Sequence, residues 1–320
     1  MALGEFQMID RLLKPLAAGC PGALGLTDDA ALLAQQPGTQ LVLAKDAIVE
    51  AVHFRKEDPP GTVAQKLLRQ NLSDLAAMGA EPVGYLTAFG LRRDLPEGWL
   101  EAFVAGLAED QARFGIHLLG GDTVSTRGPL FFSLTVLGRV PAGAALTRAG
   151  AKPGDLVCVS GTLGDSALGL AVLEGRIAAP ADSAAYLAGR YRVPEPRLAL
   201  GQALRGLASA CLDVSDGLLG DLGHILATSG SGGELGALVR AGDLPLSPAA
   251  ATLPGALEAA LTGGDDYELL FTLPPRHRDR LAELPVPVAV IGEIRSGGGT
   301  EVLDSAGALL TLSGRSWTHF

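Results

Sequence analysis

Apolar positions along the chain alternate between strand-like and helix-like spacing. Short apolar runs, several rich in β-branched and aromatic residues, predict strands at 41–44, 83–89, 116–119, 130–137, 156–160, 268–273 and 286–291. Apolar residues three and four positions apart predict helices at 62–78, after Pro96, at 165–173, at 194–207 and after Gly217. Strands that alternate with helices in this way indicate a mixed α/β protein.

A stretch rich in glycine, proline and alanine, 138–154, interrupts this alternation. Strand and helix signals begin again after it. We therefore expect an N-terminal domain over 1–140 and a C-terminal domain over 150–320. Segment 229–264 has weak periodicity and gives no clear prediction.

Composition narrows the class of protein. With 48% hydrophobic and 19% charged residues among 320, the chain can bury a sizeable core. A formal net charge of −10 argues against nucleic-acid and anionic-membrane partners, which select basic surfaces. No apolar run reaches the length of a membrane span or a signal peptide, and Cys20, Cys158 and Cys211 lack metal-ligand spacing. We expect a cytoplasmic protein.

Aspartates recur beside glycines at the predicted ends of strands and in tight turns. They fall in five groups: Asp28–Asp29, Asp46, Asp122, Asp213 with Asp216, and Asp265–Asp266. Turns and helix caps explain a single aspartate of this kind. Five such groups favour a site for Mg²⁺, which prefers hard oxygen ligands shared with substrate phosphates. The chain has no G-x-x-x-x-G-K-[ST] loop and no zinc-ligand spacing among its five histidines.

Asp74 differs from the other aspartates because it lies inside the predicted helix 62–78, near its apolar face. A buried carboxylate needs a partner, since burying it unpaired costs several kcal/mol. A salt bridge to Arg69 or Lys66, or a partly exposed helix position, would satisfy it. Coordination of a metal ion would do so equally well.

Seven motifs occur in order between residues 26 and 272, within a resemblance to known proteins that extends from Gly4 to Phe320. They are LTDDAALL (26–33), VEAVHF (49–54), QNLSDLAAMGAEPVG (70–84), LGGDT (119–123), LTRAGAKPGD (146–155), DVSDGLLGDLGHI (213–225) and GGDDYELLFT (263–272). Through this ordered set the chain resembles the thiamine-monophosphate kinases, within the superfamily of aminoimidazole ribonucleotide synthetase.

The resemblance implies a fold and a reaction. The fold is a two-domain aminoimidazole ribonucleotide synthetase-like fold, whose N-terminal domain binds ATP and Mg²⁺ and forms a β-barrel in a homodimer. The C-terminal domain is α/β. The reaction transfers the γ-phosphate of ATP directly to thiamine monophosphate, assisted by several Mg²⁺ ions. The nucleophile is an ionised phosphate oxygen, so no catalytic general base is expected.

The resemblance also implies roles for individual residues. Mg²⁺ ions around the ATP phosphates would be held by aspartates and by two backbone carbonyls: Asp29, Asp46, Asp74, Asp122, Asp213, Ala44 and Lys45. Asp216 would hold a further ion. ATP would be contacted by Gly121, Asp122, Ser215 and, at its phosphates, Arg148. Thiamine monophosphate would be contacted by His53 at its phosphate and by Asp265 and Trp317 at its thiamine end.

Four residues at three places depart from the pattern of the family. Ala44-Lys45 stands where hydroxyl residues are usual, Thr27 replaces a glycine, and Asp265 replaces a glutamate. Sister enzymes of the superfamily are alternatives: aminoimidazole ribonucleotide synthetase, selenophosphate synthetase and the hydrogenase-maturation carbamoyl dehydratase. A nucleotide-binding module without catalysis and a metal-dependent phosphohydrolase are alternatives of other classes.

Overall fold

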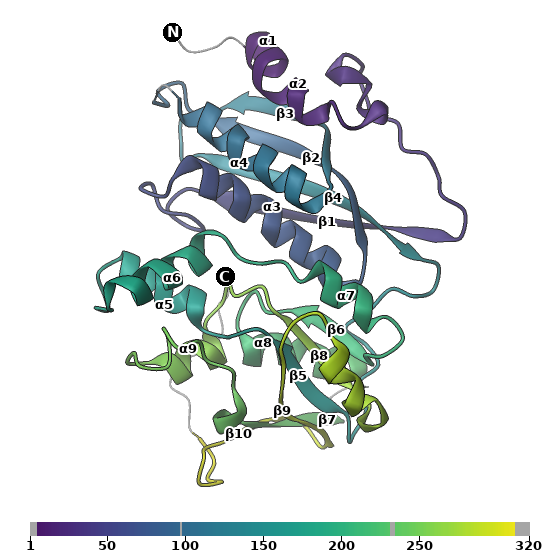
Figure 1. Ribbon diagram of the computed structural model, residues 1–320, viewed down its shortest axis with the longest axis vertical. Helices are drawn as coiled ribbons and strands as arrows, with labels where there is room; N and C mark the ends of the chain where they lie inside the picture. The colour runs from purple at the N-terminus through teal and green to yellow at the C-terminus, as the bar shows by residue number, and fades with distance from the viewer. Residues whose placement is uncertain (1–4, 97, 231–233, 311–320) are drawn as a thin grey trace. The chain divides into compact units, whose positions relative to one another are not determined.

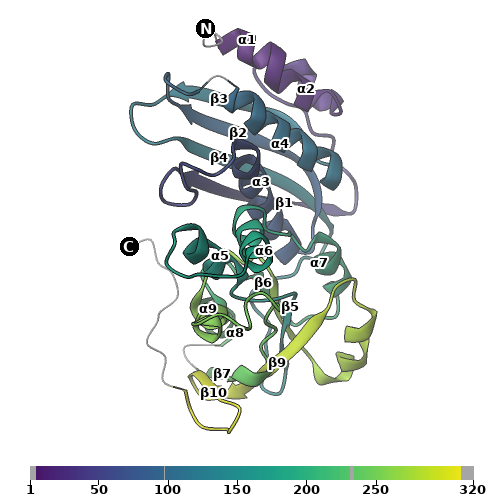
Figure 2. The same ribbon diagram turned by 60° about the vertical axis from the view of Figure 1, so that its left-hand side comes forward.

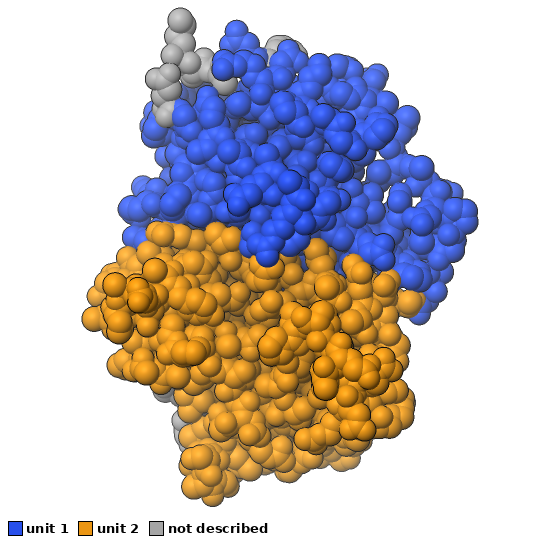
Figure 3. Space-filling model, viewed as in Figure 1, with its two compact units in different colours: residues 1–75, 80–143 blue, residues 76–79, 144–320 orange. Residues whose placement is uncertain are grey.

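The computed structural model describes residues 5–96, 98–230 and 234–310. The chain divides into two compact units. Unit 1 comprises residues 1–75 and 80–143, and unit 2 comprises residues 76–79 and 144–320; Figure 3 colours them blue and orange. Within the described ranges, no helix is both long and apolar enough to cross a membrane. The cytoplasmic location stays a prediction.

Unit 1 is built on a four-stranded sheet in the order β1-β4-β2-β3. Its strands are β1 (Thr39–Val49), β2 (Glu81–Leu91), β3 (His117–Ser125) and β4 (Phe131–Pro141). Its helical elements are α1 (Glu5–Met8), η1 (Ile9–Leu13), α2 (Lys14–Ala17), η2 (Pro21–Leu26), α3 (Pro60–Ala77) and α4 (Trp99–Phe114). β4 runs antiparallel to β1 and β2, and β2 runs parallel to β3. β1 and β3 are therefore the edge strands.

The core of unit 1 lies between one face of this sheet and the helices α3 and α4, which Figures 1 and 2 show lying across that face. Phe103 of α4 stacks on Phe132 of β4 with ring centroids 4.5 Å apart and meets Phe89 of β2 edge-on. Between the helices, Arg69 of α3 binds the fully buried Asp110 of α4 through two hydrogen bonds of 2.7 and 2.8 Å. This geometry satisfies a charge that would otherwise be costly to bury.

Unit 2 is built on a six-stranded sheet in the order β10-β7-β9-β5-β8-β6. Its strands are β5 (Leu156–Ser160), β6 (Ala210–Asp213), β7 (Leu235–Arg240), β8 (Leu269–Leu273), β9 (Val288–Ser296) and β10 (Gly299–Leu303). Its helical elements are α5 (Asp165–Leu173), α6 (Ala181–Arg192), α7 (Leu198–Leu204), α8 (Leu218–Ser229), η3 (Ala241–Asp243), α9 (Ala256–Thr262) and η4 (Pro275–Glu283). All pairings in this sheet are antiparallel except that of β10 with β7.

The larger core cluster of unit 2 is aliphatic, in contrast to the aromatic core of unit 1. Leu218, Leu222 and Ile225, spaced along one face of α8, are fully buried against Val159 and Leu270 of the sheet. A second cluster packs α7 against β5, β6 and β8. Both faces of β8 are thus covered, which explains why every residue of this strand except Thr272 is apolar.

The mixed α/β class with two domains of the superfamily type is confirmed, whereas a closed barrel is not found among the described residues. Two sequence expectations about strand ends are wrong. Asp46 and Asp122 lie inside β1 and β3 and not at their ends. Both strands are edge strands with a solvent-facing side, so they tolerate the charged and glycine residues that we interpreted as terminators.

Candidate functional site

A cavity of about 210 Å³ opens beside the edge strand β3 of unit 1. Its polar wall is made of Asp28, Asp29, Thr87, Gly120, Gly121, Asp122 and Thr123. Apolar residues of η1 and η2, such as Leu13 and Ala23, line another part. The structure therefore brings together two aspartate groups that lie almost 100 residues apart in the sequence. Asp28, Asp29 and Asp122 are all exposed. Their carboxylates can therefore bind a cation without the cost of breaking a buried ion pair.

Gly121 fixes the close approach of β3 to β2 in this wall. A Cβ atom at Gly121 would lie 2.4 Å from both the backbone oxygen and the hydroxyl of Thr87. Only glycine fits there, and its missing side chain leaves backbone accessible beside Asp122. The Asp122 carboxylate accepts a 2.8 Å hydrogen bond from the N–H of Thr123, which orients it at the strand surface.

A second group of candidate ligands lies at the opposite edge of the same sheet. The N–H of Asp46 in β1 donates a 3.0 Å hydrogen bond to Oδ1 of the fully buried Asn71 of α3. The Asn71 amide nitrogen donates in turn to the carbonyl of Leu67 at 2.8 Å. Asp74 follows Asn71 by three residues, so it lies on the same face of α3 and is half-buried. Arg69 binds Asp110 and Lys66 donates to the carbonyl of His53, and the ion-pair and metal-ligand interpretations of Asp74 both stay predictions.

The two groups of unit 1 are separated by the width of the sheet. Asp46 is opposite Leu134 in β4, which is opposite Thr87 in β2. Thr87 is opposite Gly121 in β3. Three strand spacings give a separation of about 14 Å between the backbones of Asp46 and Gly121. Asp122 is the next residue after Gly121 and faces the other side of the sheet. One metal ion cannot be shared by Asp46 and Asp122 of one chain at that distance.

Lys45 is engaged away from the Asp46 carboxylate. Its ammonium group donates a 2.7 Å hydrogen bond to the hydroxyl of Ser133 in β4. That hydroxyl donates to the carbonyl of Asp46 at 3.1 Å. Side chains alternate along a strand, so Lys45 and Asp46 project from opposite faces of β1. Ala44 lies on the Asp46 face and is half-buried.

His53 closes the turn that follows β1. Its Nδ1 accepts a 3.1 Å hydrogen bond from the N–H of Val49. In the neutral ring the proton then resides on Nε2, which becomes the donor. The ring is half-buried. A donor nitrogen held by the backbone in this way can bind a phosphate oxygen.

In unit 2, the strand β6, which the apolar pattern did not predict, ends at Asp213 and leads through a tight turn into α8, the helix expected after Gly217. The turn carries Ser215 and Asp216. One carboxylate oxygen of the buried Asp221, in the first turn of α8, accepts hydrogen bonds from the N–H groups of Ser215, Asp216 and Gly217, each at 3.1 Å. Asp221 therefore fixes the backbone that presents the two candidate ligands.

Acidic groups crowd this turn. Burial, reinforced by the nearby charge of Asp213, raises the pKa of Asp221 to about 7. Oxygen and nitrogen ligand atoms of Asp216, Asp221 and His224 lie within 4.8 Å of one another. Mutual repulsion of this kind is relieved by a bound cation. The two carboxylates of this group offer hard oxygen donors, the kind of ligand that Mg²⁺ prefers.

The loop 263–268 lies directly against this turn. The N–H of Asp265 donates to the carbonyl of Ser215 at 2.8 Å, and the N–H of Tyr267 donates to the carbonyl of Val214 at 2.9 Å. A Cβ atom at Gly264 would lie 2.4 Å from the Ser215 oxygen, so glycine is required for this contact. The structure thus brings Asp265 to the candidate ligands Ser215 and Asp216.

Arg148 is exposed in the segment that precedes β5, and its carbonyl accepts a 3.2 Å hydrogen bond from Ser229. The neighbouring Thr147 pairs through its backbone with Cys211 at the start of β6. Trp317 lies outside the described residues. The roles of all these residues toward metal and substrate stay predictions.

Sequence reasoning missed the residues that hold the candidate ligands in place. Asn71, Asp221 and Glu268 all occur within the quoted motifs, yet no role was assigned to them. For Asp221, an acidic residue in the first turn of a helix after glycine was an available signal. Asn71 and Glu268 act through partners distant in sequence, which no local pattern reveals.

Both units match families of known proteins. Residues 27–140 match the family described as AIR synthase related protein, N-terminal domain. Residues 152–305 match the AIR synthase related protein, C-terminal domain. The two halves of an AIR synthase related protein are therefore present in their usual order.

Full-length relatives define the family more closely. The thiamine-monophosphate kinase of Caulobacter vibrioides is 46% identical over 98% of this chain and 90% of its own length. That of Escherichia coli K12 is 42% identical over 100% of this chain and 99% of its own. This chain therefore belongs to the thiamine-monophosphate kinase family, which confirms the resemblance drawn from the motifs.

Solved structures agree with this assignment. The crystal structure of thiamine-monophosphate kinase from Stenotrophomonas maltophilia K279a is 42% identical, with a TM-score of 0.84, and covers 94% of this chain and 97% of its own. The structure of AaThiL complexed with AMPPCP and TMP is 29% identical, with a TM-score of 0.79, over 100% of this chain and 99% of its own.

Proposed function

We propose that this protein transfers the γ-phosphate of ATP to thiamine monophosphate, forming thiamine diphosphate and ADP. Membership of the thiamine-monophosphate kinase family and the likeness to AaThiL complexed with AMPPCP and TMP support the reaction and both substrates. The observation in this chain that carries the proposal is the unit 1 cavity with its exposed aspartates beside glycine backbone. Such a surface suits a magnesium–triphosphate group.

Several Mg²⁺ ions are part of the proposal. The carboxylates present fit this ion, because Asp28, Asp29 and Asp122 offer hard oxygen donors at one edge of the sheet and Asp46 and Asp74 offer them at the other. About 14 Å separates the two edges, so the two groups would bind different ions. When bound, Mg²⁺ neutralises charge on the transferring phosphoryl group.

The chain's own residues position the reactants. In unit 1, glycine backbone at Gly121 admits a phosphate close to Asp122, and Nε2–H of His53 binds a phosphate oxygen of thiamine monophosphate. In unit 2, we infer that Arg148 and Ser215 contact ATP and that Asp213 and Asp216 hold metal. The attacking phosphate oxygen forms a bond to the γ-phosphorus as the bond to the β,γ-bridging oxygen breaks and ADP leaves. Orientation and charge neutralisation then supply most of the rate enhancement.

The thiamine end is proposed to lie against Asp265 and Trp317. Thiamine carries a cationic thiazolium ring, which a carboxylate and an aromatic face both attract. Asp265 is half-buried and its backbone is fixed against Ser215, so its carboxylate has a defined direction. The family's more usual glutamate would reach one methylene further.

We also propose that the protein is a homodimer formed through unit 1. The face of the sheet opposite α3 and α4 exposes apolar side chains on both edge strands: Leu41 and Leu43 of β1, 52% and 63% exposed, and Val124 of β3, 55% exposed. Exposed apolar side chains gathered on one face indicate an interaction surface. Two such sheets facing each other would supply the barrel expected from the resemblance. A Leu43→Asp variant that remains dimeric by light scattering would argue against this surface.

The experiment that tests the function follows two products. Purified protein is incubated with ATP, MgCl₂ and thiamine monophosphate, and ADP and thiamine diphosphate are quantified together. We expect one thiamine diphosphate for each ADP, and loss of both in Asp74→Asn and Asp122→Asn. These substitutions keep the side-chain shape but remove the charge that binds metal.

Other outcomes distinguish the alternatives. ADP and free phosphate released without an acceptor would identify a phosphohydrolase and overturn the kinase proposal. ATP binding with no turnover would favour a nucleotide-binding module. Activity that survives both substitutions would show that metal is held elsewhere.

A further inference from the structure

In the loop 263–268, residues with strained backbone alternate with residues whose side chains are buried. Asp265 and Tyr267 adopt left-handed backbone conformations, with φ of 67° and 52°. Such conformations are unfavourable for residues other than glycine and persist only when the surroundings impose them. The residues between and after them, Asp266 and Glu268, are 1% and 0% exposed. The loop therefore alternates strained residues with deeply anchored ones.

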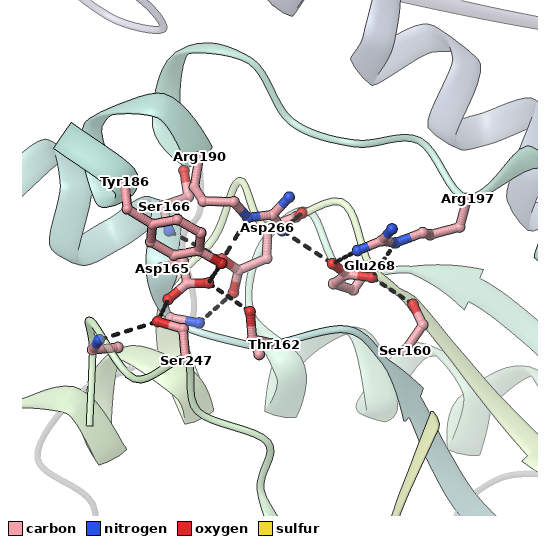
Figure 4. A network of polar contacts seen from close by, with 12 residues as sticks. Ser160, Thr162, Asp165, Ser166, Tyr186, Arg190, Arg197, Ser247, Asp266 and Glu268 are labelled. Carbon is pink, nitrogen blue, oxygen red and sulfur yellow. Dashed lines mark hydrogen bonds and ion pairs between the residues drawn. The ribbon is translucent and has the colours of Figure 1, made fainter. Parts of the chain in front are cut away.

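Glu268 is the stronger anchor, and Figure 4 shows its carboxylate between two arginines. Arg197 binds it in a bidentate manner through Nε and Nη2, both at 2.6 Å. Arg190 donates to it at 3.0 Å and Ser160 at 2.6 Å. A Cβ atom at Gly161 would lie 2.2 Å from Oε1, so the β5 end is also shaped around this carboxylate.

Asp266 anchors the loop to the start of α5. Its two carboxylate oxygens accept hydrogen bonds from the N–H groups of Gly164 at 2.6 Å and Ser166 at 3.1 Å. Arg190 also donates to the Asp266 carbonyl at 3.3 Å. Together, Arg190, Asp266 and Glu268 tie the loop to α5, α6 and β5 on both sides of Tyr267.

Arg190 also lies close to a third buried carboxylate, that of Asp165. Asp165 is fully buried and accepts hydrogen bonds from Ser247 and Thr162, each at 2.5 Å, and from Tyr186 at 3.2 Å. Its carboxylate lies 3.8 Å from Nε of Arg190. Figure 4 shows these groups as one connected network. Charges placed in this way resist displacement, because moving one leaves another unpaired.

Tyr267 connects this network to the side chain of Asp265. Its hydroxyl donates a 3.1 Å hydrogen bond to Oδ1 of Asp265, and its ring is 7% exposed. We propose that Tyr267 and Glu268 are positioning residues for the Asp265 carboxylate: Tyr267 orients it directly, and Glu268 holds the strained loop from which it projects. The inference rests on the proposed function, in which Asp265 faces the thiamine end of the substrate.

Neither residue is a catalytic residue. Glu268 is inaccessible, and both of its oxygens are bound by arginine. The role of both residues is therefore to fix the direction of the Asp265 carboxylate, which affects the binding of thiamine monophosphate. It leaves the chemistry at the phosphates unchanged.

The test is a comparison of Tyr267→Phe with Ser166→Ala. Tyr267→Phe removes one hydroxyl and keeps the ring that packs the loop. Ser166 is buried close by in the same network, and its hydroxyl is without a hydrogen-bond partner among the described residues. Removing that hydroxyl leaves no acceptor or donor unpaired, so Ser166→Ala is the matched control.

We expect Tyr267→Phe to raise the KM for thiamine monophosphate by about tenfold or more, as the loss of one hydrogen bond to a charged group implies. The kcat and the KM for ATP should stay within about twofold, and Ser166→Ala should match wild type in all three. Glu268→Gln should raise the same KM further, and Glu268→Asp should not restore it, because the shorter side chain cannot keep the bidentate contact. Direct titration of thiamine monophosphate without ATP should show the same order of affinities.

Two results would overturn the proposal in distinguishable ways. If wild type forms thiamine diphosphate and Tyr267→Phe leaves its KM for thiamine monophosphate unchanged, or weakens ATP equally, Tyr267 does not position Asp265. If wild type neither binds nor phosphorylates thiamine monophosphate, the proposed function fails and the role of Tyr267 fails with it.

Discussion

Solvent exposure differs between two groups of carboxylates: those beside β3 in unit 1 and those of the buried polar network in unit 2. Asp28, Asp29 and Asp122 are exposed around a cavity. Asp165 and Glu268 are fully buried, and each is bound by several donors of the protein itself. The same chemical group is thus left for a ligand in one unit and used to build the fold in the other.

This difference in exposure predicts different consequences when the carboxylates are substituted. An exposed carboxylate adds little to the free energy of folding, because water and salt screen it. A buried carboxylate that loses its partner costs several kcal/mol. Substitutions in unit 1 should therefore change activity with the fold intact, and substitutions in the network should change stability first.

The largest expected effect is on activity, in Asp29→Asn. We expect kcat/KM to fall by at least about 10²-fold, since the variant removes charge that would neutralise the transferring phosphate. The free energy of unfolding should stay within about 0.5 kcal/mol of wild type. Coupled ADP release and chemical denaturation measure the two quantities. Asp182→Asn, an exposed aspartate of α6, is the control and should change neither. Equal losses of activity in both variants would remove the distinction between the two regions.

Arg197→Ala should have the largest effect on stability. Glu268 would keep Arg190 and Ser160 but lose its bidentate partner, and a broken buried ion pair costs about 3–5 kcal/mol. Urea denaturation measures it. Arg176→Ala removes an arginine that pairs with Glu174 on the surface, where a pair is worth less than about 1 kcal/mol. A loss in Arg197→Ala no larger than in Arg176→Ala would mean that the network is not a stabilising unit.

The pH dependence of stability sharpens the comparison further. Burial raises the pKa of Asp266 from 3.8 to about 7, although hydrogen bonds from Gly164 and Ser166 oppose the shift. The folded chain then binds a proton that the unfolded chain has released, so this carboxyl stabilises the fold below about pH 4 and the contribution is lost as pH rises to 7.

Replacement of Asp266 by asparagine should remove that contribution. Between pH 5 and 7, the free energy of unfolding of Asp266→Asn relative to wild type should rise by up to about 1.4 kcal/mol per pH unit. Thermal unfolding at a series of pH values, in EDTA to exclude metal effects, measures the difference. A difference that does not change with pH would show that Asp266 is ionised throughout.

The sequence predicted helices and strands correctly where the local apolar spacing determines them. β5 and α5 occur with the bounds that their apolar spacing predicts, and Gly217 leads into α8 as expected. Asp46 and Asp122 were misplaced because a charged residue or a glycine pair looks like a strand end. On an edge strand, however, one side faces water and a glycine can serve a close contact with a neighbouring strand.

The sequence predicted the candidate ligands but not the residues that hold them in place. Asp122 and Asp216 lie beside glycine and Asp29 follows Asp28, each in a short motif, so the local sequence marks them. Glu268 is held by Arg197, which is 71 residues away in the chain. Such a pairing arises only when strands and helices come together, so no local pattern contains it.

The smallest expected effect concerns Lys45, the departure closest to a candidate ligand. Its ammonium group binds the Ser133 hydroxyl on the face of β1 opposite to the Asp46 carboxylate, so it does not compete for a cation held there. We expect Lys45→Ser to change kcat/KM by less than about threefold and the free energy of unfolding by about 1 kcal/mol or less. The Mg²⁺ concentration for half-maximal activity should be unchanged. Ser133→Ala removes the same hydrogen bond from the other side, together with the bond to the Asp46 carbonyl, and should give a somewhat larger loss of stability. If Lys45→Ser lowers the Mg²⁺ requirement while Ser133→Ala does not, the lysine charge acts on the metal site directly. The half-buried Asp46 carboxylate of unit 1 would then be influenced by a neighbouring cation, as the buried carboxylates of unit 2 are.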